Sequence, residues 1–502
     1  MNDVPEPQAT EPRADHAWLA AGLSFVFPGL GDAYAGRRRA AVIFALPILI
    51  LVAIVAGLLT GVIDADQSVL LSTGFLIALL VLNGAVMAWR AAAIAHAGLW
   101  PRGATPEHER RTATLLTAVL IALTIGMHAW VGVVVVNLEQ TLSEVFGGAI
   151  PGVRPPDAML VPSGATPGPA ASAIAEPTDR WDGTERINIL LLGTDAAPGR
   201  DAVLTDVILV VSVDPVDESA AMISVPRDTG FVPLPDDSIH GSGLFPDKVN
   251  ALLATAANDP DRWCPDRDPD DGPGCGLRTV EEAIGLYLGI EIHHYALVDM
   301  AGFAGLIDAL GGLELCLPGR LVDPEFDGSL ENEVVTEPLV LPAGCHQYDG
   351  LDALAYARSR KGWIEMPDGT REPQNDFTRA DRQQRVLLAL RREMAEADTL
   401  FELPAVLGAI GRTVSTDFPR DQAGELASLV PLITGPDIER LVLSYPEFVD
   451  LPTEPEVNYL LIPRRDAIRD RMADLFGADD LRGWYLGGTG ERPEAGAPLD
   501  EP

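Results

Sequence analysis

Long hydrophobic runs are concentrated in the first third of this 502-residue chain. Three of them, at about Ala40–Val62, Val69–Trp89 and Thr112–Val136, have the length of helices that cross a bilayer. A fourth stretch, Ala17–Leu30, is shorter and is interrupted by proline and glycine, so we expect an interfacial or re-entrant segment there. Burial in a globular core is the alternative for such runs, but three of them with a consistent charge bias favour a membrane region.

The charges that flank these runs are distributed unevenly. Arginines precede the first run and fill the loop between the second and the third, whereas the turn at residues 64–67 has no positive charge. The arginines are Arg37, Arg38, Arg39, Arg90, Arg102, Arg110 and Arg111. Because basic loops stay in the cytoplasm, we expect the N-terminus and the second loop inside the cell and everything after residue 137 outside. If Ala17–Leu30 also crossed the membrane, the N-terminus would lie outside the cell, and the side of every later segment would be unchanged.

Beyond the hydrophobic third, the pattern becomes that of a linker followed by a globular domain. Residues 147–180 are rich in proline, glycine and alanine, which predicts an extended linker. Short apolar runs then predict strands at 187–192, 203–213, 220–225, 295–298, 313–317 and 459–462, and helical patterns cover 279–288, 300–310 and 379–394. This alternation predicts an α/β fold with helices on both faces of a sheet.

The chain is therefore predicted to have five parts. Residues 1–36 form a cytoplasmic tail with a short interfacial segment, 37–136 a transmembrane region of about three helices, and 137–182 an extracellular linker. Residues 183–477 form an extracellular α/β(-α) sandwich with a central mixed sheet. Residues 478–502 form an acidic tail that we expect to be disordered.

Charge and cysteine content narrow the possible functions. A net charge of −37 argues against general nucleic-acid binding and is explained by solubility. All four cysteines follow residue 260, in the part expected outside the cell, where disulfides are permitted. Of the three possible pairings we favour Cys264–Cys275, which would close an Asp/Pro-rich loop, with Cys316–Cys345. A zinc site is the alternative, although no close Cys-x-x-Cys pair favours it.

A compact basic stretch, Ala357–Arg385, is unusual in so acidic a chain. Arg358 and Arg360 are two residues apart and would point the same way in an extended segment. The second part of the stretch has helical spacing that places Asp376, Arg379, Arg382, Gln383 and Val386 on one face. Asn375 or Asp376 is positioned to cap this helix. If the two parts fold together, several guanidinium groups converge where they can bind phosphate oxygens bidentately. The alternative is a solvated helix face with internal ion pairs.

Further charged residues follow predicted strands. Asp195, Asp206 and the segment Pro226-Arg227-Asp228-Thr229 lie at or near strand ends, and Lys248-Val249-Asn250 begins a helical stretch. Ligand sites of open α/β sheets collect at the carboxyl ends of strands, so Asp195 and Asp206 could share a Mg²⁺ ion. The alternative is that these aspartates are ordinary turn residues.

Taken together and in this order, the motifs resemble the LytR-CpsA-Psr family. They are Gly193-Thr194-Asp195, Thr205-Asp206, Pro226-Arg227-Asp228-Thr229, Lys248-x-Asn250, Gly302-Phe303-x-x-Leu306-Ile307-Asp308-Ala309-Leu310-Gly311-Gly312, Ala355-Tyr356-Ala357-Arg358-x-Arg360 and Asp376-Phe377-x-Arg379-x-x-Arg382-Gln383-x-Arg385. The resemblance covers roughly residues 185–395 and extends more weakly to 477.

The resemblance implies a membrane-anchored phosphotransferase that moves a glycopolymer from an undecaprenyl- or decaprenyl-pyrophosphate carrier to peptidoglycan. It implies Mg²⁺ near Asp195 and Asp206, and it places Arg227, Arg358, Arg360, Arg379 and Gln383 on the pyrophosphate. Lys248 and Arg382 complete the expected pyrophosphate-binding set, and the expected catalytic residues are Asp206, Arg227, Asp228, Arg358 and Arg360. The family commonly has an arginine two residues before Asp206, where this chain has Leu204; Arg200 is a possible replacement.

The expected chemistry is direct attack by a sugar hydroxyl, since phosphoryl transfer requires charge neutralisation and alignment rather than a protein nucleophile. Asp206 or Asp228 is the candidate base, and Asp228 is alternatively a structural partner of an arginine. The helices at 279–288 and 300–310 are expected to line an apolar groove for the prenyl tail. Two other functions remain open: a pyrophosphatase that acts on the same lipid, and a non-enzymatic wall-binding or regulatory membrane protein.

Overall fold

The computed structural model describes residues 16–60, 69, 71–100, 107–147, 181, 185–194, 204–235, 242–265, 274–326, 338–396, 403–429, 438–452, 459–477 and 481. The chain divides into two compact units, Met1–Glu139 and Gln140–Pro502. Most of the predicted linker, the predicted tail except residue 481, Asp195 and Arg200 lie outside the described residues.

The first unit is helical. Its helices are α1 (Ala17–Val26), α2 (Leu30–Tyr34), α3 (Arg38–Leu59), α5 (Thr73–Leu99) and α6 (Glu107–Val145), the last of which continues into the second unit. Helices α3, α5 and α6 coincide with the three predicted hydrophobic runs and are long and apolar enough to cross a membrane. The predicted interruption of the first stretch is also present, because Gly29 has a φ of 92° and separates α1 from the short helix α2.

A buried carboxylate joins the short helix α2 to the longer helices of this unit. Asp32 is fully buried, and its Oδ1 lies 2.7 Å from Arg37 Nε and 2.8 Å from His96 Nδ1. A buried carboxylate needs such partners to offset its lost hydration. The Asp32 contacts therefore tie α2 to the start of α3 and to the last turns of α5.

The second unit is built on a mixed sheet, as predicted. Its strands are β1 (Ile187–Thr194), β2 (Thr205–Asp214), β3 (Ser219–Ser224), β4 (His294–Asp299), β11 (Val414–Thr416) and β12 (Ile438–Val442). Within the described part of the chain the order is β11-β4-β1-β2-β3-β12. β1 is parallel to β4 and β3 is parallel to β12, whereas β1–β2, β2–β3 and β4–β11 are antiparallel.

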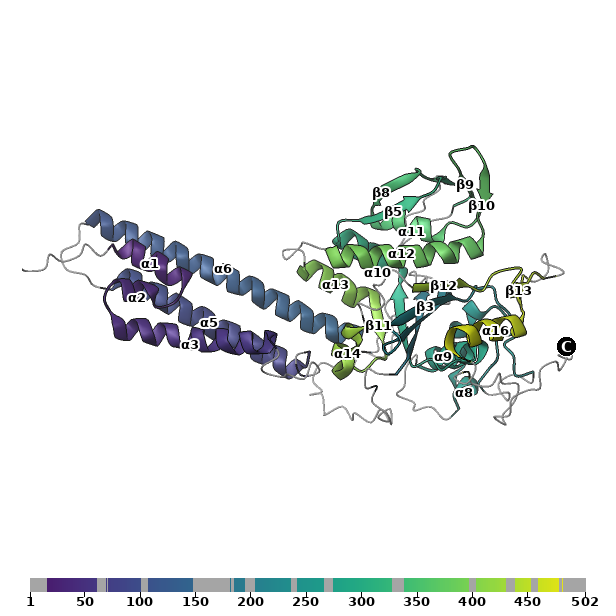
Figure 1. The fold of residues 1–502 in the computed structure, drawn as a ribbon, viewed down its shortest axis with the longest axis horizontal. Coiled ribbons are helices and arrows are strands. Elements are labelled where there is room, and N and C mark those ends of the chain that lie inside the picture. Colours follow the sequence, from purple (N-terminus) through teal and green to yellow (C-terminus); the bar gives the residue numbers. More distant parts are fainter. Residues whose placement is uncertain are drawn as a thin grey trace, which may run out of the picture. The chain divides into compact units, whose positions relative to one another are not determined.

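Helices cover both faces of this sheet (Figure 1). One face carries α7 (Leu252–Asn258), α8 (Pro260–Trp263), α9 (Gly274–Leu288) and α16 (Arg465–Phe476), and the other carries α10 (Met300–Ala309), α11 (Gly350–Arg358), α12 (Asp376–Glu396) and α13 (Leu403–Thr413). Successive strand residues point to opposite faces. Leu190, Leu192 and Leu297 accordingly belong to the core shared with α9, whereas Leu191 and Val298 face α10 and α12.

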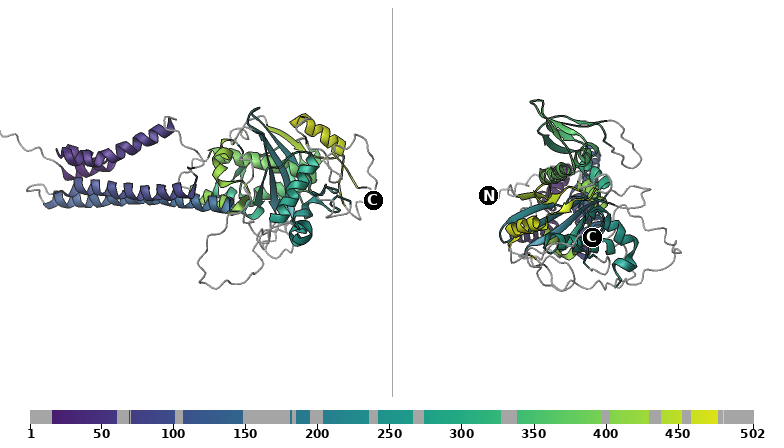
Figure 2. Two further views of the ribbon diagram at one scale, coloured as in Figure 1. Left: turned by 90° about the horizontal axis from the view of Figure 1, so that it is seen from below. Right: turned by 90° about the vertical axis from the view of Figure 1, so that its right-hand side faces the viewer.

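Small sheets pack outside the second helical layer, as the green strands in the right-hand view of Figure 2 show. β5 (Leu313–Leu317) pairs with β8 (Gly344–Tyr348), and β10-β9-β6-β7 form a four-stranded sheet from Arg371–Pro373, Trp363–Glu365, Arg320–Asp323 and Leu339–Leu341. β13 (Val449–Asp450) pairs with β14 (Ile462–Pro463), so regular strand pairing begins later than the predicted strand at 459–462. Short helices η1 (Val249–Ala251), η2 (Arg420–Gln422) and α14 (Ala423–Ser428) complete the unit.

Both favoured cysteine pairs are bonded in the structure. Cys316 and Cys345 face each other across β5 and β8, and Cys264 pairs with Cys275 at the start of α9. All four sulfur atoms are therefore in disulfides, and none is a thiolate that could bind zinc.

The close approach of α11 to α10 requires a glycine. Gly350 opens α11, and a Cβ atom at this position would lie 2.0 Å from the carbonyl oxygen of Ala304 in α10. The amide of Gly350 donates to Asp308 Oδ1 at 2.7 Å, which fixes the same junction. Since α11 carries Arg358 at its other end, this contact helps to determine where that arginine lies.

We expect Gly350→Ala to destabilise the second unit by about 1–3 kcal/mol, because the added methyl group cannot be accommodated without moving a helix. Gly305→Ala, on α10 itself, is the matched control: a Cβ there meets nothing within 4 Å. That control should be neutral or stabilising by about 0.5–1 kcal/mol. Thermal unfolding of the full-length protein in detergent measures both; equal melting temperatures for the two variants would contradict the packing described.

Candidate functional site

A cavity of about 490 Å³ lies between the sheet and helices α10, α11 and α12. Its apolar lining comes from four strands and the facing helices, and includes Leu191, Val207, Ala296, Val298, Met300, Phe303, Leu306, Leu354, Val386, Leu387, Leu390 and Val414. Helix α10 thus lines the cavity as predicted. The other helix expected to do so, α9, packs on the opposite face of the sheet and contributes no lining residue.

The cavity is apolar along its length and cationic at one end. Along α12 the lining residues change from Arg379 and Gln383 in the first turns to Val386 and Leu390 further on. Along α11 they change from Leu354 to Arg358 at the last residue. The cationic residues therefore collect where α12 begins and α11 ends. Cations from Arg227, Arg358, Arg360, Lys361 and Arg379 line the cavity together with carboxylates of Asp206, Asp323 and Glu325.

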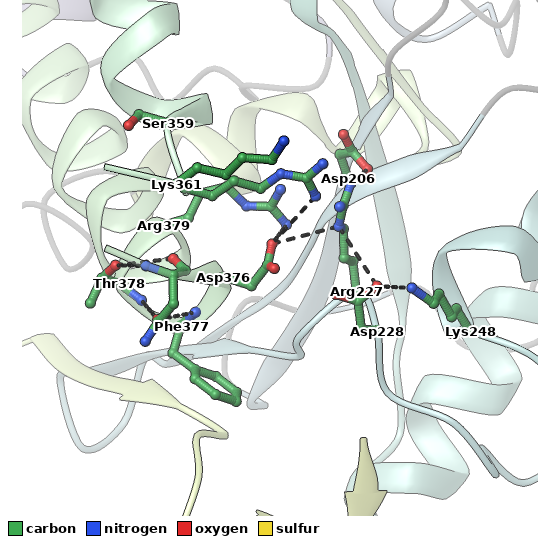
Figure 3. A network of polar contacts seen from close by, with 12 residues as sticks. Asp206, Arg227, Asp228, Lys248, Ser359, Lys361, Asp376, Phe377, Thr378 and Arg379 are labelled. Carbon is green, nitrogen blue, oxygen red and sulfur yellow. Dashed lines mark hydrogen bonds and ion pairs between the residues drawn. The ribbon is translucent and has the colours of Figure 1, made fainter. Parts of the chain in front are cut away.

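One carboxylate, Asp376, draws three of these arginines together (Figure 3). Its Oδ1 atom lies 3.0 Å from Arg379 Nη2, 3.6 Å from Arg227 Nε and 4.0 Å from Arg360 Nη1. Asn375 caps α12, since its Oδ1 accepts hydrogen bonds from the amides of Phe377 and Thr378. The cap fixes where the helix starts, and this sets the position of Asp376.

Arg227 connects this cluster to the sheet. It follows β3 in the predicted Pro-Arg-Asp-Thr segment, and its Nη1 donates to Asp206 Oδ1 at 2.7 Å. Burial lowers the pKa of Arg227, but the carboxylates of Asp206, Asp376 and Asp228 together outweigh burial and raise it. Its charge is therefore fixed, and Asp206 is held at the wall of the cavity.

Arg379 lies at the cavity wall, and the described residues leave one of its donor atoms unsatisfied. It is 5% exposed, and its Nε atom has no hydrogen-bond partner among the described residues. Burial, with the neighbouring charge of Arg227, lowers the pKa of Arg379. Buried donors are normally satisfied, so an anion in the cavity would supply what this guanidinium lacks.

Arg358 and Arg360 both line the cavity, but the predicted extended geometry is wrong. Arg358 is the last residue of α11, and Arg360 follows in a loop. The loop is held by Asp323 at the end of β6, whose Oδ2 accepts from Ser359 Oγ at 2.8 Å and from the amides of Arg360 and Lys361 at 3.2 Å. Sequence reasoning missed Asp323; a strand-ending aspartate was the only signal, since its partners lie more than thirty residues further along the chain.

Arg382, which was expected on the pyrophosphate, does not line the cavity. It is 2% exposed, and its guanidinium donates to the carbonyls of Tyr356 and Ser359 and to Gln374 Oε1. Burial lowers the pKa of Arg382 to about 10. Arg382 therefore braces α12 against the end of α11. Gln383, by contrast, lines the cavity as predicted. The alternative of a solvated helix face with internal ion pairs is met in part: Arg379 pairs with Asp376 and Arg385 pairs with Asp381, but Arg379 and Arg382 are buried.

Lys248 and Asp228 lie next to the arginine cluster and form a pair of their own. Lys248 Nζ donates to Asp228 Oδ1 at 2.7 Å, and the same oxygen lies 3.9 Å from Arg227 Nε. Neither residue lines the cavity. This agrees with the alternative that Asp228 is a structural partner of an arginine.

Of the two predicted metal ligands, the structure describes only Asp206. Its carboxylate has the oxygen chemistry that Mg²⁺ requires and lies at the cavity wall, although one oxygen is engaged by Arg227. Among the described residues, no group of three or more His, Cys, Asp or Glu side chains could hold a metal ion. Asp195 lies outside these residues, so the magnesium site stays a prediction.

Comparisons with known proteins match most of the second unit. The LytR_cpsA_psr family model matches residues 169–453. The polyisoprenyl-teichoic acid–peptidoglycan teichoic acid transferase TagU of Halalkalibacterium halodurans is 30% identical over 270 residues, which cover 51% of this chain and 73% of that protein. The regulatory protein MsrR of Staphylococcus aureus is 32% identical over 234 residues, 47% of this chain and 57% of MsrR, so the match spans less than two thirds of its length.

Solved structures are similar at lower identity. TagV of B. subtilis aligns with a TM-score of 0.41 and 23% identity, covering 59% of this chain and 98% of that chain. TagT bound to LIIa-WTA aligns with a TM-score of 0.40 and 20% identity, covering 61% and 94%.

The two arginine roles predict different effects on stability. Arg382→Met leaves two carbonyls and an amide oxygen without their donor, so we expect a loss of about 3 kcal/mol or more in the free energy of unfolding. Arg360→Met removes a cation whose side chain is 39% exposed, and stability should stay within about 1 kcal/mol. Thermal unfolding in detergent distinguishes the two; a stable Arg382→Met protein would mean that this arginine is not a structural brace.

Proposed function

Because the chain belongs to the LytR-CpsA-Psr family, we propose that it is a membrane-anchored phosphotransferase that moves a glycopolymer from a polyprenyl-pyrophosphate carrier to peptidoglycan. The observation that carries the proposal is the cavity, which joins an apolar body to a cationic end. A carrier lipid has the same two parts, an isoprenoid chain and a pyrophosphate. TagU is a relative by sequence. Its name describes the transfer of teichoic acid from a polyisoprenyl-linked form to peptidoglycan.

The charges at the cavity support binding of a pyrophosphate diester. Five lining side chains are cationic and three are carboxylates, and Asp376 adds a fourth carboxylate against Arg227, Arg360 and Arg379, which leaves an excess of one positive charge. Each phosphorus of such a diester carries one negative charge, so this excess offsets part of the charge of the ligand. Guanidinium groups of Arg358, Arg360 and Arg379 would hold the phosphate oxygens, since planar forks suit them. Gln383 adds a neutral donor.

The proposed reaction breaks one bond and forms one bond at phosphorus. A hydroxyl of the acceptor sugar attacks the phosphorus next to the glycan, and the bridging bond between phosphorus and oxygen breaks. The polyprenyl phosphate leaves, and the arginines stabilise the negative charge that develops on it. The hydroxyl proton passes to a carboxylate, for which Asp206 at the cavity wall and Asp228 behind Arg227 are the candidates.

We propose Mg²⁺ as the cofactor, with Asp206 and Asp195 as carboxylate ligands. When bound, the ion would neutralise phosphate charge beyond what the arginines provide. The protein's own contribution at this place is to hold Asp206, through Arg227, at the edge of the cavity.

Membrane anchoring completes the proposal. Helices α3, α5 and α6 are long and apolar enough to span a bilayer, and the arginines between them favour a cytoplasmic N-terminus. The second unit would then lie outside the cell, where its two disulfides are compatible with the compartment. The peptidoglycan acceptor is on the same side.

The test is native mass spectrometry of the detergent-extracted full-length protein, with wild type beside Arg358→Ala/Arg360→Ala. We expect a bound polyprenyl pyrophosphate or phosphate in the wild type and its loss in the double variant, because two cations that line the cavity are removed. Arg391→Ala/Arg392→Ala removes the same charge from a part of α12 that does not line the cavity, and it should keep the lipid.

Two results would count against the proposal. One is a lipid retained equally by the cavity variant and by the control. The other is a folded wild-type protein that carries no lipid and does not bind added polyprenyl pyrophosphate, which would favour a non-enzymatic role in the cell wall.

A further inference from the structure

A second group of polar and aromatic side chains adjoins the arginine cluster outside the cavity. It consists of Asp228, Lys248 and Tyr459, none of which lines the cavity. In Figure 3, Asp228 and Lys248 lie beyond Arg227 as seen from Arg379 and Lys361. Arg227 lines the cavity and its Nε atom lies 3.9 Å from Asp228 Oδ1, so the polar group adjoins the cavity at this arginine.

Backbone hydrogen bonds hold the group in place from three distant segments. The amide of Leu461 donates to the carbonyl of Asp228 at 2.9 Å, and the amide of Gly230 donates to the carbonyl of Leu461 at 3.0 Å. The amide of Val249 donates to the carbonyl of Thr229 at 2.8 Å. Residues 227–230 are therefore pinned on one side by the segment that carries Tyr459 and on the other by the segment that carries Lys248.

The exposed ring of Tyr459 is the distinctive part of this group. It is 38% exposed, and Lys248 Nζ lies 5.7 Å from the ring centroid. Burial, and then the carboxylates of Asp228 and Asp376, raise the pKa of Tyr459, so its hydroxyl stays neutral beside the cluster. An aromatic ring beside a lysine and a carboxylate suits a sugar: the ring stacks on the apolar face, and the charged groups bond to hydroxyls.

We propose that Tyr459, Lys248 and Asp228 form the subsite that binds the acceptor sugar. The inference rests on the proposed transferase function, and it assigns a binding site to the second substrate, the peptidoglycan acceptor. In-line transfer requires the attacking oxygen and the leaving oxygen on opposite sides of phosphorus. With the prenyl phosphate held in the cavity, we assign the acceptor to the polar group that adjoins Arg227 outside the cavity, where Lys248 and Tyr459 lie. Lys248 then contacts the acceptor rather than the carrier.

The test measures binding of the two substrates separately. The full-length protein in detergent is titrated with a soluble glycan-chain fragment of peptidoglycan and, independently, with a short-chain polyprenyl pyrophosphate. Tyr459→Ala should weaken binding of the glycan fragment about tenfold, the value of a stacking contact. Tyr459→Phe keeps the ring and should bind the fragment within about twofold of wild type. Both variants should bind the prenyl pyrophosphate as the wild type does.

The outcomes separate this inference from the proposed function. Equal glycan affinity in wild type and Tyr459→Ala overturns the acceptor subsite, even if carrier binding and transfer are intact. Loss of prenyl pyrophosphate binding in Tyr459→Ala also overturns it, because Tyr459 would then serve the carrier. Failure of the wild type to bind prenyl pyrophosphate counts against the transferase instead, while selective loss of glycan binding in Tyr459→Ala would still establish a sugar site.

Discussion

The site depends on one carboxylate that holds mutually repelling cations together. Arg227, Arg360 and Arg379 come from three separate segments, and each lies within 4.0 Å of Asp376 Oδ1. Without a shared counter-charge, bringing these guanidinium groups together, with Arg227 and Arg379 largely buried, would cost several kcal/mol through desolvation and repulsion. Asp376 compensates in part, and Asp206 and Asp228 further offset the charge of Arg227. In the proposed function, the pyrophosphate of the carrier would meet the positive charge that remains.

The loop that carries Arg360 is held by two buried charges of opposite sign. From one side, Arg382 donates to the carbonyls of Tyr356 and Ser359 at the end of α11, where the helix dipole favours a cation. From the other side, Asp323 accepts from the Ser359 hydroxyl and from the amides that follow it. Arg382 therefore satisfies a carbonyl that the end of α11 leaves open, and Asp323 satisfies amides of the loop that follows. The rigidity of the loop comes from residues that are not expected to touch the substrate.

Local pattern predicted most of the fold because alternation and helical spacing are local properties. The strands β1, β3 and β5 and the helices α9, α10 and α12 lie close to their predicted ranges. The family motifs also identified six residues that line the cavity: Asp206, Arg227, Arg358, Arg360, Arg379 and Gln383. Residue spacing alone could not show which of Arg379 and Arg382 faces the cavity, because both lie on the inner side of one helix. Which of them faces the cavity depends on where α11 ends, and this is decided by packing between elements distant in sequence.

The two faces of the sheet that supports this site carry side chains of different size, and this difference explains the cavity. Toward α9 the central strands present the large side chains of Leu190, Leu192 and Leu297, which pack into a continuous core. Toward α10 and α12 the same strands present smaller residues, among them Gly193 and Ala296, and these leave space. The cavity of about 490 Å³ therefore has its apolar body where the strands carry small side chains, and its cationic end where α11 ends and α12 begins.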